Sequence, residues 1–239
     1  QRQFLLKFAR DRQAWMAWLF EARKRFGLCV LDYMVTCNHI HLLVYDRQGR
    51  DVIPDSVQLV AGRSGQEYNQ RKKRRGAYWE DRYHATAVET GEHLRQCLLY
   101  IDLNMVRAGA VAHPEQWPEC GYVEIQHPKA RWRMIDEDQL MELVGVNGRG
   151  ALQQLCREQV EAALERGLEG RQSQWTESIA VGTPQYLAAL ERQLGVRAKG
   201  RAMQPVEGGY QLRETERVYQ RLLSGEKAAP SLQNTFFWN

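Results

Sequence analysis

CNHIHLLV, residues 37–44, is the stretch of sequence that decides the fold. Side chains at alternate positions of a strand point to one face, so this strand presents His39 and His41 together. The apolar residues between and after the two histidines anchor the opposite face in a core. Residues 28–36 form a second strand-like run, and the turn character around Asn38 predicts that the two strands pair antiparallel. Two neighbouring imidazoles are a ready pair of ligands for a divalent metal ion.

Helical patterns flank these strands. A first helix has Asp11 as a plausible N-cap, and Gly27 stops it. A second helix begins near Pro54, which the first turn of a helix tolerates, and continues into a basic cluster that Gly76 ends. Strand alternation returns in residues 85–88. Strands and helices therefore mix, which predicts an α+β first module.

A third helix, residues 93–108, carries the other polar candidates. Tyr100 and Asn104 are four residues apart and therefore share one face of this helix, with Arg107 close to the same side. Taken singly, a helical Tyr is more often half-buried core and a helical Asn a solvated polar residue. Together, a phenol beside an amide oxygen suits a metal-assisted attack on a phosphodiester, with the phenol as nucleophile and the amide completing the ligand set of the metal.

These motifs together resemble those of a known family. The histidine stretch, the segment from Trp79 to Tyr83 and the run from Tyr100 to Gly109 are similar to the corresponding motifs of the REP-associated tyrosine transposases. These proteins are a branch of the single-tyrosine His-hydrophobic-His (HUH) nucleases. The resemblance spans residues 1–122, about half of the chain, and the joint spacing is far more specific than either motif alone.

The resemblance implies a ferredoxin-like antiparallel sheet with packed helices. It implies that His39, His41 and Asn104 hold Mg²⁺ or Mn²⁺, and that Tyr100 attacks a phosphodiester of single-stranded DNA. The products would be a 5′-phosphotyrosine link and a free 3′-OH that can reverse the reaction without ATP. The implied substrates are imperfect hairpins of repetitive extragenic palindromes (REP), and the protein would act as a monomer or a homodimer.

The sequence departs from the family pattern in two places. The family usually begins with a strand that carries a Tyr-His-x-Thr-x-Arg-Gly-Asn-like motif, and no such motif precedes Gln1. The transposase domain, residues 1–127, is therefore expected to lack its N-terminal strand, which would weaken the sheet. Met105 stands where Pro is common, with little expected consequence, because Met continues a helix more readily than Pro.

Positive charge is concentrated between Arg63 and Arg82. Seven basic residues there face three acidic ones, an excess that equals the net charge of +4 of the whole chain. Positive charge tracks phosphates and aromatic faces stack on unpaired bases, although a charge run can also be a solvated face and the aromatics can belong to the core. The expected DNA-binding residues are Arg71, Lys72, Lys73, Arg74, Arg75, Trp79, Arg82, Tyr83 and, from the third helix, Arg107.

The remainder of the chain, residues 128–239, is expected to form a mainly helical second module. The predicted helices span residues 136–144, 151–166, 184–194 and 214–223, with a mobile basic connector at residues 195–209. Several cations of this module are candidates for contacts with hairpin phosphates or for a plain surface loop: Arg192, Arg197, Lys199, Arg201 and Arg213. The closing residues 236–238 either dock on the main domain or stay loose.

Composition is that of an ordinary soluble protein, with 44% hydrophobic and 26% charged residues. No apolar run is long enough to span a bilayer, and the first residues lack the order of a signal peptide, so a cytoplasmic, nucleoid-associated protein without membrane partners is expected. The five cysteines are scattered and form no C-x-x-C pair, which predicts reduced thiols.

Two other functions compete with the transposase interpretation. A non-catalytic DNA-binding regulator could keep the fold without the chemistry, although the complete set of two histidines, Tyr100 and Asn104 argues against it. A metal-dependent phosphoesterase could use water instead of the tyrosine, but such sites usually need more acidic ligands. Near the motifs lie Glu89 and Asp102, and Asp102 points away from the Tyr100 face of an ideal helix.

Overall fold

An antiparallel hairpin forms the centre of the computed structural model, which describes residues 5–47, 51–79, 82–168 and 170–214. Strand β1 (Cys29–Val35) pairs with β2 (Ile40–Tyr45), as the sequence predicts. Every residue of β1 is buried, whereas β2 is mostly half-buried. The strand with the histidines is therefore the more open of the two.

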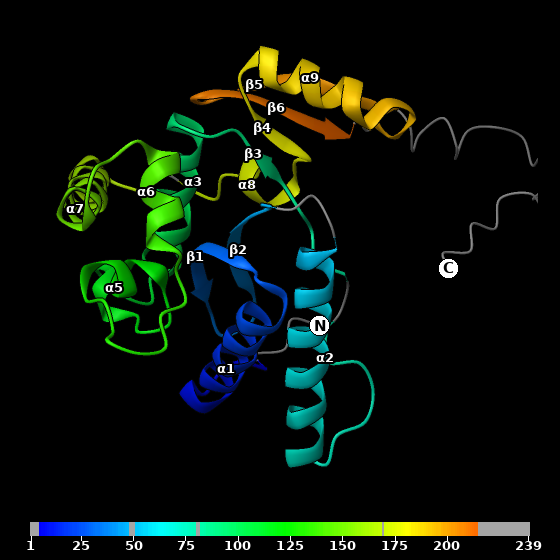
Figure 1. Cartoon of the computed structure of the whole chain (residues 1–239), viewed down its shortest axis with the longest axis vertical. Coiled ribbons are helices and arrows are strands. Elements are labelled where there is room, and N and C mark those ends of the chain that lie inside the picture. The colour runs from blue at the N-terminus through cyan, green and yellow to red at the C-terminus, as the bar shows by residue number, and fades with distance from the viewer. Residues whose placement is uncertain (1–4, 48–50, 80–81, 169, 215–239) are drawn as a thin grey trace, which may run out of the picture.

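Helices cover the hairpin on both sides (Figure 1). On one side α1 (Ala9–Phe26) packs against α2 (Val52–Arg71). On the other side β1 contacts α3 (Glu92–Asp102), α5 (Gly121–Gln126) and α6 (Glu137–Val144). Helix α7 (Arg149–Arg166) packs behind α3, α5 and α6. The buried apolar residues of all these elements form one continuous core, which confirms the α+β class with a small antiparallel sheet and packed helices.

A second sheet joins two distant parts of the chain, in the order β3-β4-β6-β5. Its strand β3 (Ala87–Val88) comes just before α3 and pairs in parallel with β4 (Ala180–Gly182). Strands β5 (Arg201–Val206) and β6 (Gly209–Glu214) form an antiparallel hairpin, and β6 pairs with β4. In the described part of the chain, β3 therefore extends a sheet built mostly from C-terminal residues.

Three predicted helix boundaries need correction. Helix α1 begins at Ala9 with Phe8 as its N-cap residue, and Asp11 lies inside the first turn. Helix α2 ends at Arg71, so the rest of the basic cluster follows the helix. The third predicted helix divides at Leu103 into α3 and the short α4 (Asn104–Arg107), although the Arg107 N–H still bonds the Leu103 carbonyl oxygen at 2.9 Å.

The C-terminal part contains the predicted helices, with strands between them. Helices α6, α7 and α9 (Pro184–Leu194) match three of the predictions. The fourth predicted helix lies outside the described residues except for its first residue, which ends β6. The expected mobile connector at residues 195–209 is folded: it forms the short η2 (Gly195–Ala198), β5 and the tight turn at Gly208. Pairing with β6 fixes it, because each strand supplies the hydrogen bonds that the other needs.

Shorter elements complete the fold: η1 (Pro114–Gln116) precedes α5, and α8 (Gln174–Glu177) precedes β4. All five cysteines are free thiols, as predicted. None of the helices in the described ranges combines the length and the apolar character needed to cross a membrane.

Candidate active site

The turn between β1 and β2 holds His39 in a fixed position. The Thr36 hydroxyl accepts the His39 N–H at 3.0 Å and donates to the His39 carbonyl oxygen at 2.7 Å. On the imidazole, Nδ1 lies 2.8 Å from Asn38 Oδ1 and 3.1 Å from Thr36 Oγ1. Since an amide oxygen accepts hydrogen bonds, this arrangement favours the tautomer that carries its proton on Nδ1 and its lone pair on Nε2.

His41 lies between the other three candidate residues. Its ring centroid is 4.9 Å from that of His39 and 5.9 Å from that of Tyr100, with the rings nearly perpendicular in both pairs. Its Nε2 lies 2.9 Å from Asn104 Nδ2. One cluster thus contains His39 from the turn before β2, His41 from β2, Tyr100 from α3 and Asn104 from α4.

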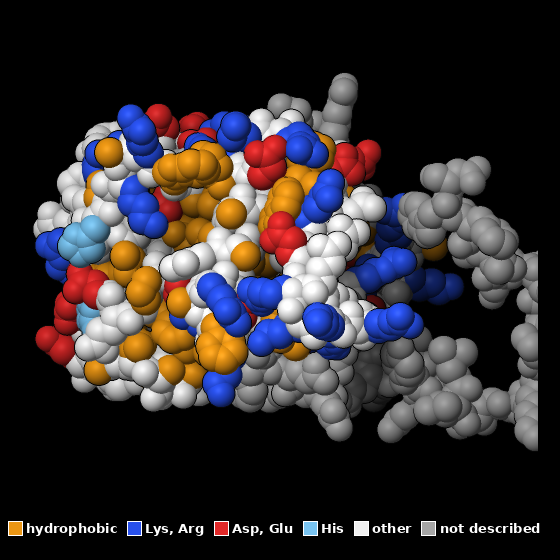
Figure 2. All heavy atoms as spheres, turned by 90° about the horizontal axis from the view of Figure 1, so that it is seen from below, with side chains coloured by type: hydrophobic (Ala, Val, Ile, Leu, Met, Phe, Trp, Pro, Cys, Tyr) orange, Lys and Arg blue, Asp and Glu red, His pale blue; other side chains and the backbone are white. Residues whose placement is uncertain are grey.

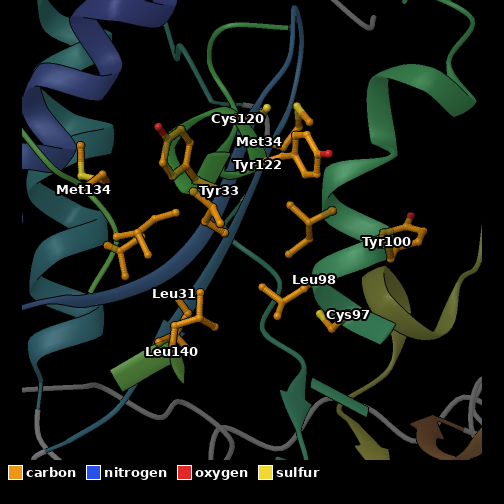
Figure 3. Close-up of a cluster of buried hydrophobic side chains, with 14 of the residues drawn as sticks. Leu31, Tyr33, Met34, Cys97, Leu98, Tyr100, Cys120, Tyr122, Met134 and Leu140 are labelled. Atoms are coloured by element: carbon orange, nitrogen blue, oxygen red, sulfur yellow. The ribbon is translucent and has the colours of Figure 1, made fainter. Parts of the chain in front are cut away.

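The Tyr100 ring lies on the side of α3 that faces away from the hairpin, and it is still part of the buried core. Figure 3 shows Leu98 directed from α3 toward the strands and Tyr100 on the far side of the helix, near α8. There the Arg107 guanidinium carbon lies 4.1 Å from the Tyr100 ring centroid, and Arg107 also donates to the Tyr100 carbonyl oxygen. The Trp175 ring of α8 lies 6.3 Å away, centroid to centroid. These neighbours leave Tyr100 only 5% exposed.

Burial and positive neighbours keep the His41 imidazole neutral. Burial, and after it the charges of His39, Arg107 and Arg171, together lower the pKa of His41 to about 3. Neutral imidazole is the form that binds metals, so His41 need not lose a proton when it binds a metal ion. Burial also lowers the pKa of Arg107, while the neighbouring Tyr100 raises it.

The donor set fits a small divalent cation. It consists of two imidazoles and the Asn104 amide, whose oxygen and nitrogen exchange places on a half-turn of the side chain. Mn²⁺ accepts both imidazole nitrogen and amide oxygen, and Mg²⁺ prefers the oxygen. Within the described ranges, no group of three or more His, Cys, Asp or Glu side chains could hold a metal ion. A metal here therefore depends on the amide as its third protein ligand.

Three acidic residues serve the fold, and two of them, Asp102 and Glu89, are the candidates for water-based chemistry. Asp102 is buried on the core side of α3, where burial raises its pKa to about 8. Asp32 of β1 is also fully buried, and its pKa lies well above the usual range because of burial and the charge of Asp102. Glu89 accepts hydrogen bonds from the Thr183 N–H and hydroxyl, which joins β3 to the start of α9. None of these three carboxylates belongs to the histidine cluster.

The basic cluster after α2 divides into two kinds of residue. Arg71 forms an ion pair with Asp11, and Arg74 donates to Asn69 Oδ1 and to the Ala77 carbonyl oxygen, so both serve the packing of α1, α2 and the following turn. Lys73 and Arg75, with Arg74, line an open hollow of about 470 Å³ that also includes Gln66, Asn69 and Gln70. Figure 2 shows blue Lys and Arg side chains gathered on this lower face of the molecule, with hydrophobic side chains among them.

Of the two aromatic residues predicted to contact DNA, one packs inside the protein and one is exposed. The Trp79 indole donates to the Ala61 carbonyl oxygen at 3.0 Å and packs against the core, so its ring supports α2. Tyr83 is 53% exposed and remains available to a base, and Arg82 beside it is exposed too. Arg107 lies against Tyr100 rather than on an open DNA surface.

Among the C-terminal cations, Arg213 forms an ion pair with Glu177, and Arg201 with Glu214.

Two residues near the site were not expected from the sequence. Trp175 reaches Tyr100 from a segment far along the chain, and Arg171 is close enough to His41 to lower its pKa. Both lie just before β4, a three-residue strand with no alternation to detect. The local sequence therefore carries no signal for these contacts.

One comparison with known protein families bears on the class of protein that has this fold and this cluster of two histidines, a tyrosine and an amide. Residues 1–104 match the family described as "Transposase IS200 like", and the match contains the hairpin, α3 and the cluster up to Asn104. Residues 1–104, somewhat less than half of the chain, are thus similar to IS200-like transposases, enzymes that cut DNA and transfer strands. Searches among curated proteins and among solved structures gave no significant match.

Proposed function

We propose that this protein is a transposase that cuts and rejoins single-stranded DNA through a covalent bond to Tyr100. The observation that carries the proposal is the position of His41, whose ring lies 5.9 Å from Tyr100 and whose Nε2 lies 2.9 Å from the Asn104 amide. His41 is thus a neighbour both of the proposed nucleophile, Tyr100, and of the proposed metal ligand Asn104. They also lie within the part of the chain that matches the transposase family.

The chain's own residues account for the nucleophilic step. The Tyr100 oxygen attacks the phosphorus of a phosphodiester, and the bond from that phosphorus to the 3′-oxygen of the preceding nucleotide breaks. The phenol releases its proton to solvent, and the departing 3′-oxygen takes one up. The DNA 5′ end remains on Tyr100 as a phosphate diester, so attack by a 3′-OH reverses the reaction without an external energy source. Arg107 keeps positive charge beside the phenol.

His39, His41 and Asn104 would hold Mg²⁺ or Mn²⁺. When bound, the metal ion polarises the phosphate and stabilises the charge that develops on it. Asn38 and Thr36 orient the His39 ring, and burial keeps His41 neutral. Orientation of this kind contributes much of the rate of a reaction between two bound groups.

The proposed substrate is single-stranded DNA that folds into imperfect hairpins of the REP type. The resemblance of the histidine stretch, the Trp79–Tyr83 segment and the tyrosine run supports this substrate class. The basic hollow at the end of α2 supports a polyanionic partner, because clustered Lys and Arg attract phosphates.

The test is a covalent adduct. The protein is incubated with a labelled single-stranded DNA hairpin and Mn²⁺, and a denaturing gel is examined for protein joined to DNA. We expect an adduct that disappears with chelator and with Tyr100→Phe, while Tyr100→Phe still binds the hairpin. The matched control is Tyr45→Phe, which removes the hydroxyl of a tyrosine at the opposite end of β2 and should keep the adduct.

Each other outcome has a definite meaning. An adduct that survives Tyr100→Phe moves the nucleophile to another residue. Hairpin binding without any adduct, across several hairpins and metals, favours a non-catalytic DNA-binding regulator.

A further inference from the structure

Phe8 has an exposed ring that neither the core nor the helix cap explains. It is 51% exposed and belongs to neither of the two hydrophobic clusters of the described residues. It is the N-cap residue of α1 and makes no side-chain cap hydrogen bond. Ser, Thr, Asp and Asn are the residues that favour this position, because their oxygen accepts an N–H of the first turn. The Phe8 backbone carbonyl accepts N–H groups of the first turn, but its side chain contributes little to α1.

Two cations flank the Phe8 ring. The Arg10 guanidinium carbon and the Lys72 ammonium nitrogen each lie 5.6 Å from its centroid. Both residues are exposed, and neither has a carboxylate partner among the described ion pairs. An aromatic face bordered by positive charge is how single-stranded nucleic acid is held: bases stack on the ring and phosphates pair with the cations.

The backbone connects this aromatic surface to the histidine turn. The Leu6 N–H donates to the Cys37 carbonyl oxygen at 3.0 Å, and Arg12 holds the same segment through the carbonyl oxygens of Leu6 and Lys7. Phe8 lies two residues from Leu6, and His39 lies two residues from Cys37. The reach of two residues on each side of this bond places Phe8 within roughly 20 Å of His39.

We propose that Phe8, Arg10 and Lys72 form a binding surface for the unpaired part of the DNA substrate, with one base stacked on the Phe8 ring. This surface rests on the proposed function, since the strand it holds would lead to the histidine cluster. Lys72 also joins the surface to the basic hollow lined by Lys73 and Arg75. Charge complementarity selects a polyanion, and the exposed ring selects one with unpaired bases over a closed duplex.

The test measures binding apart from chemistry. A Tyr100→Phe background prevents cleavage, and the probe is a labelled single-stranded oligodeoxythymidine followed by fluorescence anisotropy. Base stacking on an aromatic residue is worth about 1–3 kcal/mol, so Phe8→Ala should raise the Kd roughly 5- to 150-fold. Phe8→Trp should keep the wild-type Kd, because it keeps an aromatic face. The matched control Tyr45→Ala removes another exposed ring, at the far end of the hairpin, and should leave the Kd unchanged.

Two further measurements separate stacking from charge. Phe8→Ala should keep the dependence of the Kd on salt, whereas Lys72→Gln should reduce its slope by about 0.7, the value for one phosphate of a single strand. A series of oligonucleotides, each lacking the base at a different position, separates the two proteins. The protein with Phe8 should bind one member of the series less well than the others, whereas Phe8→Ala should bind all members equally well. An unchanged Kd in Phe8→Ala with a normal melting temperature overturns the proposal.

The remaining outcomes keep this surface and the chemistry distinguishable. A Phe8 effect on binding without any Tyr100 adduct supports the surface and rejects the proposed enzyme. An adduct that forms normally in Phe8→Ala at low DNA concentration supports the enzyme and rejects the surface. A change of oligomeric state in Phe8→Ala, measured by light scattering without DNA, makes Phe8 a contact between protein chains and also rejects the surface.

Discussion

The Trp175 indole lies against the Tyr100 ring, 6.3 Å between centroids and tilted by 37°. Tyr100 belongs to the segment that matches the transposase family, whereas Trp175 lies beyond it. Helix α8, which carries Trp175, leads directly into β4, and β4 pairs with β3. The C-terminal part of the chain therefore contacts the transposase-like segment at β3 and again at Tyr100.

Removal of the Trp175 side chain should make Tyr100 more reactive. Trp175→Ala takes away the ring that covers the phenol, and we expect faster formation of the covalent DNA adduct. The same change should lower the free energy of unfolding by about 3 kcal/mol, because a mostly buried indole is lost. Trp175→Phe keeps an aromatic ring over the phenol, so its rate of adduct formation should lie between those of the wild type and Trp175→Ala. A slower adduct in Trp175→Ala, with the fold intact, would mean that the indole positions the phenol instead of covering it.

Arg71 should matter for stability more than for DNA. Its guanidinium faces the Asp11 carboxylate, whose side chain is 2% exposed. Arg71→Ala leaves that carboxylate buried without its partner, and we expect a loss of about 2 kcal/mol in urea unfolding, somewhat below the cost for a fully buried pair. Because Asp11→Asn removes the charge, the double variant should be more stable than Arg71→Ala. Equal stability of the two would contradict the importance of the pair.

Arg75 should show the opposite behaviour. It lies exposed at the edge of the hollow after α2. Arg75→Ala should leave the free energy of unfolding unchanged within about 0.5 kcal/mol, as expected of an exposed residue. It should weaken the binding of single-stranded DNA and reduce the salt slope by about 0.7. If the salt slope stays as it is, Arg75 belongs to an ordinary solvated surface.

How far the sequence predicts the structure depends on whether the signal is local. The hairpin, the helix that ends at Gly27 and the helix that begins at Pro184 follow from residue periodicity and end signals. The shared face of Tyr100 and Asn104 follows from helix geometry alone. The assignment of roles to these residues stays a prediction until the adduct is tested.

The unpredicted parts are contacts between distant segments. The pairing of Ala87 with Ala180 unites strands of two and three residues, which are too short to show alternation. The cover of Tyr100 by Trp175 depends on that pairing. The division of the basic cluster depends on Asp11, which local pattern identified as a cap and which the fold uses as the partner of Arg71. Tertiary packing decided each of these features.

Asp102 should make the stability of the protein depend on pH. Its pKa is raised from the ordinary 3.8 to about 8, first of all by burial. Between these values the unfolded chain has lost a proton that the folded chain keeps, so the free energy of unfolding falls as the pH rises. Asp102→Asn replaces the titrating carboxyl group with a neutral amide, so the variant should be more stable than the wild type at pH 8, by on the order of 2 kcal/mol.

The control for Asp102 is an exposed acid. Asp138→Asn on α6 should leave the pH profile of urea unfolding unchanged. Asp32 should keep part of the pH dependence in Asp102→Asn, because burial raises its pKa as well. Identical profiles for the wild type and Asp102→Asn would show that Asp102 keeps its ordinary pKa in the fold.

Asn38 should act on the metal through His39. Its Oδ1 lies 2.8 Å from His39 Nδ1, and a hydrogen bond there orients the ring and holds the lone pair on Nε2. Loss of such an orienting partner typically weakens metal binding about 10- to 100-fold, so Asn38→Ala should raise the Kd for Mn²⁺ in calorimetric titration by this amount. Adduct formation should need more Mn²⁺ but reach the wild-type rate at saturation, because Tyr100 is untouched. Asn104→Ala removes a proposed ligand and should lower the rate even when Mn²⁺ is saturating. Equal Mn²⁺ affinity in the wild type and Asn38→Ala would exclude a metal at the His39 ring.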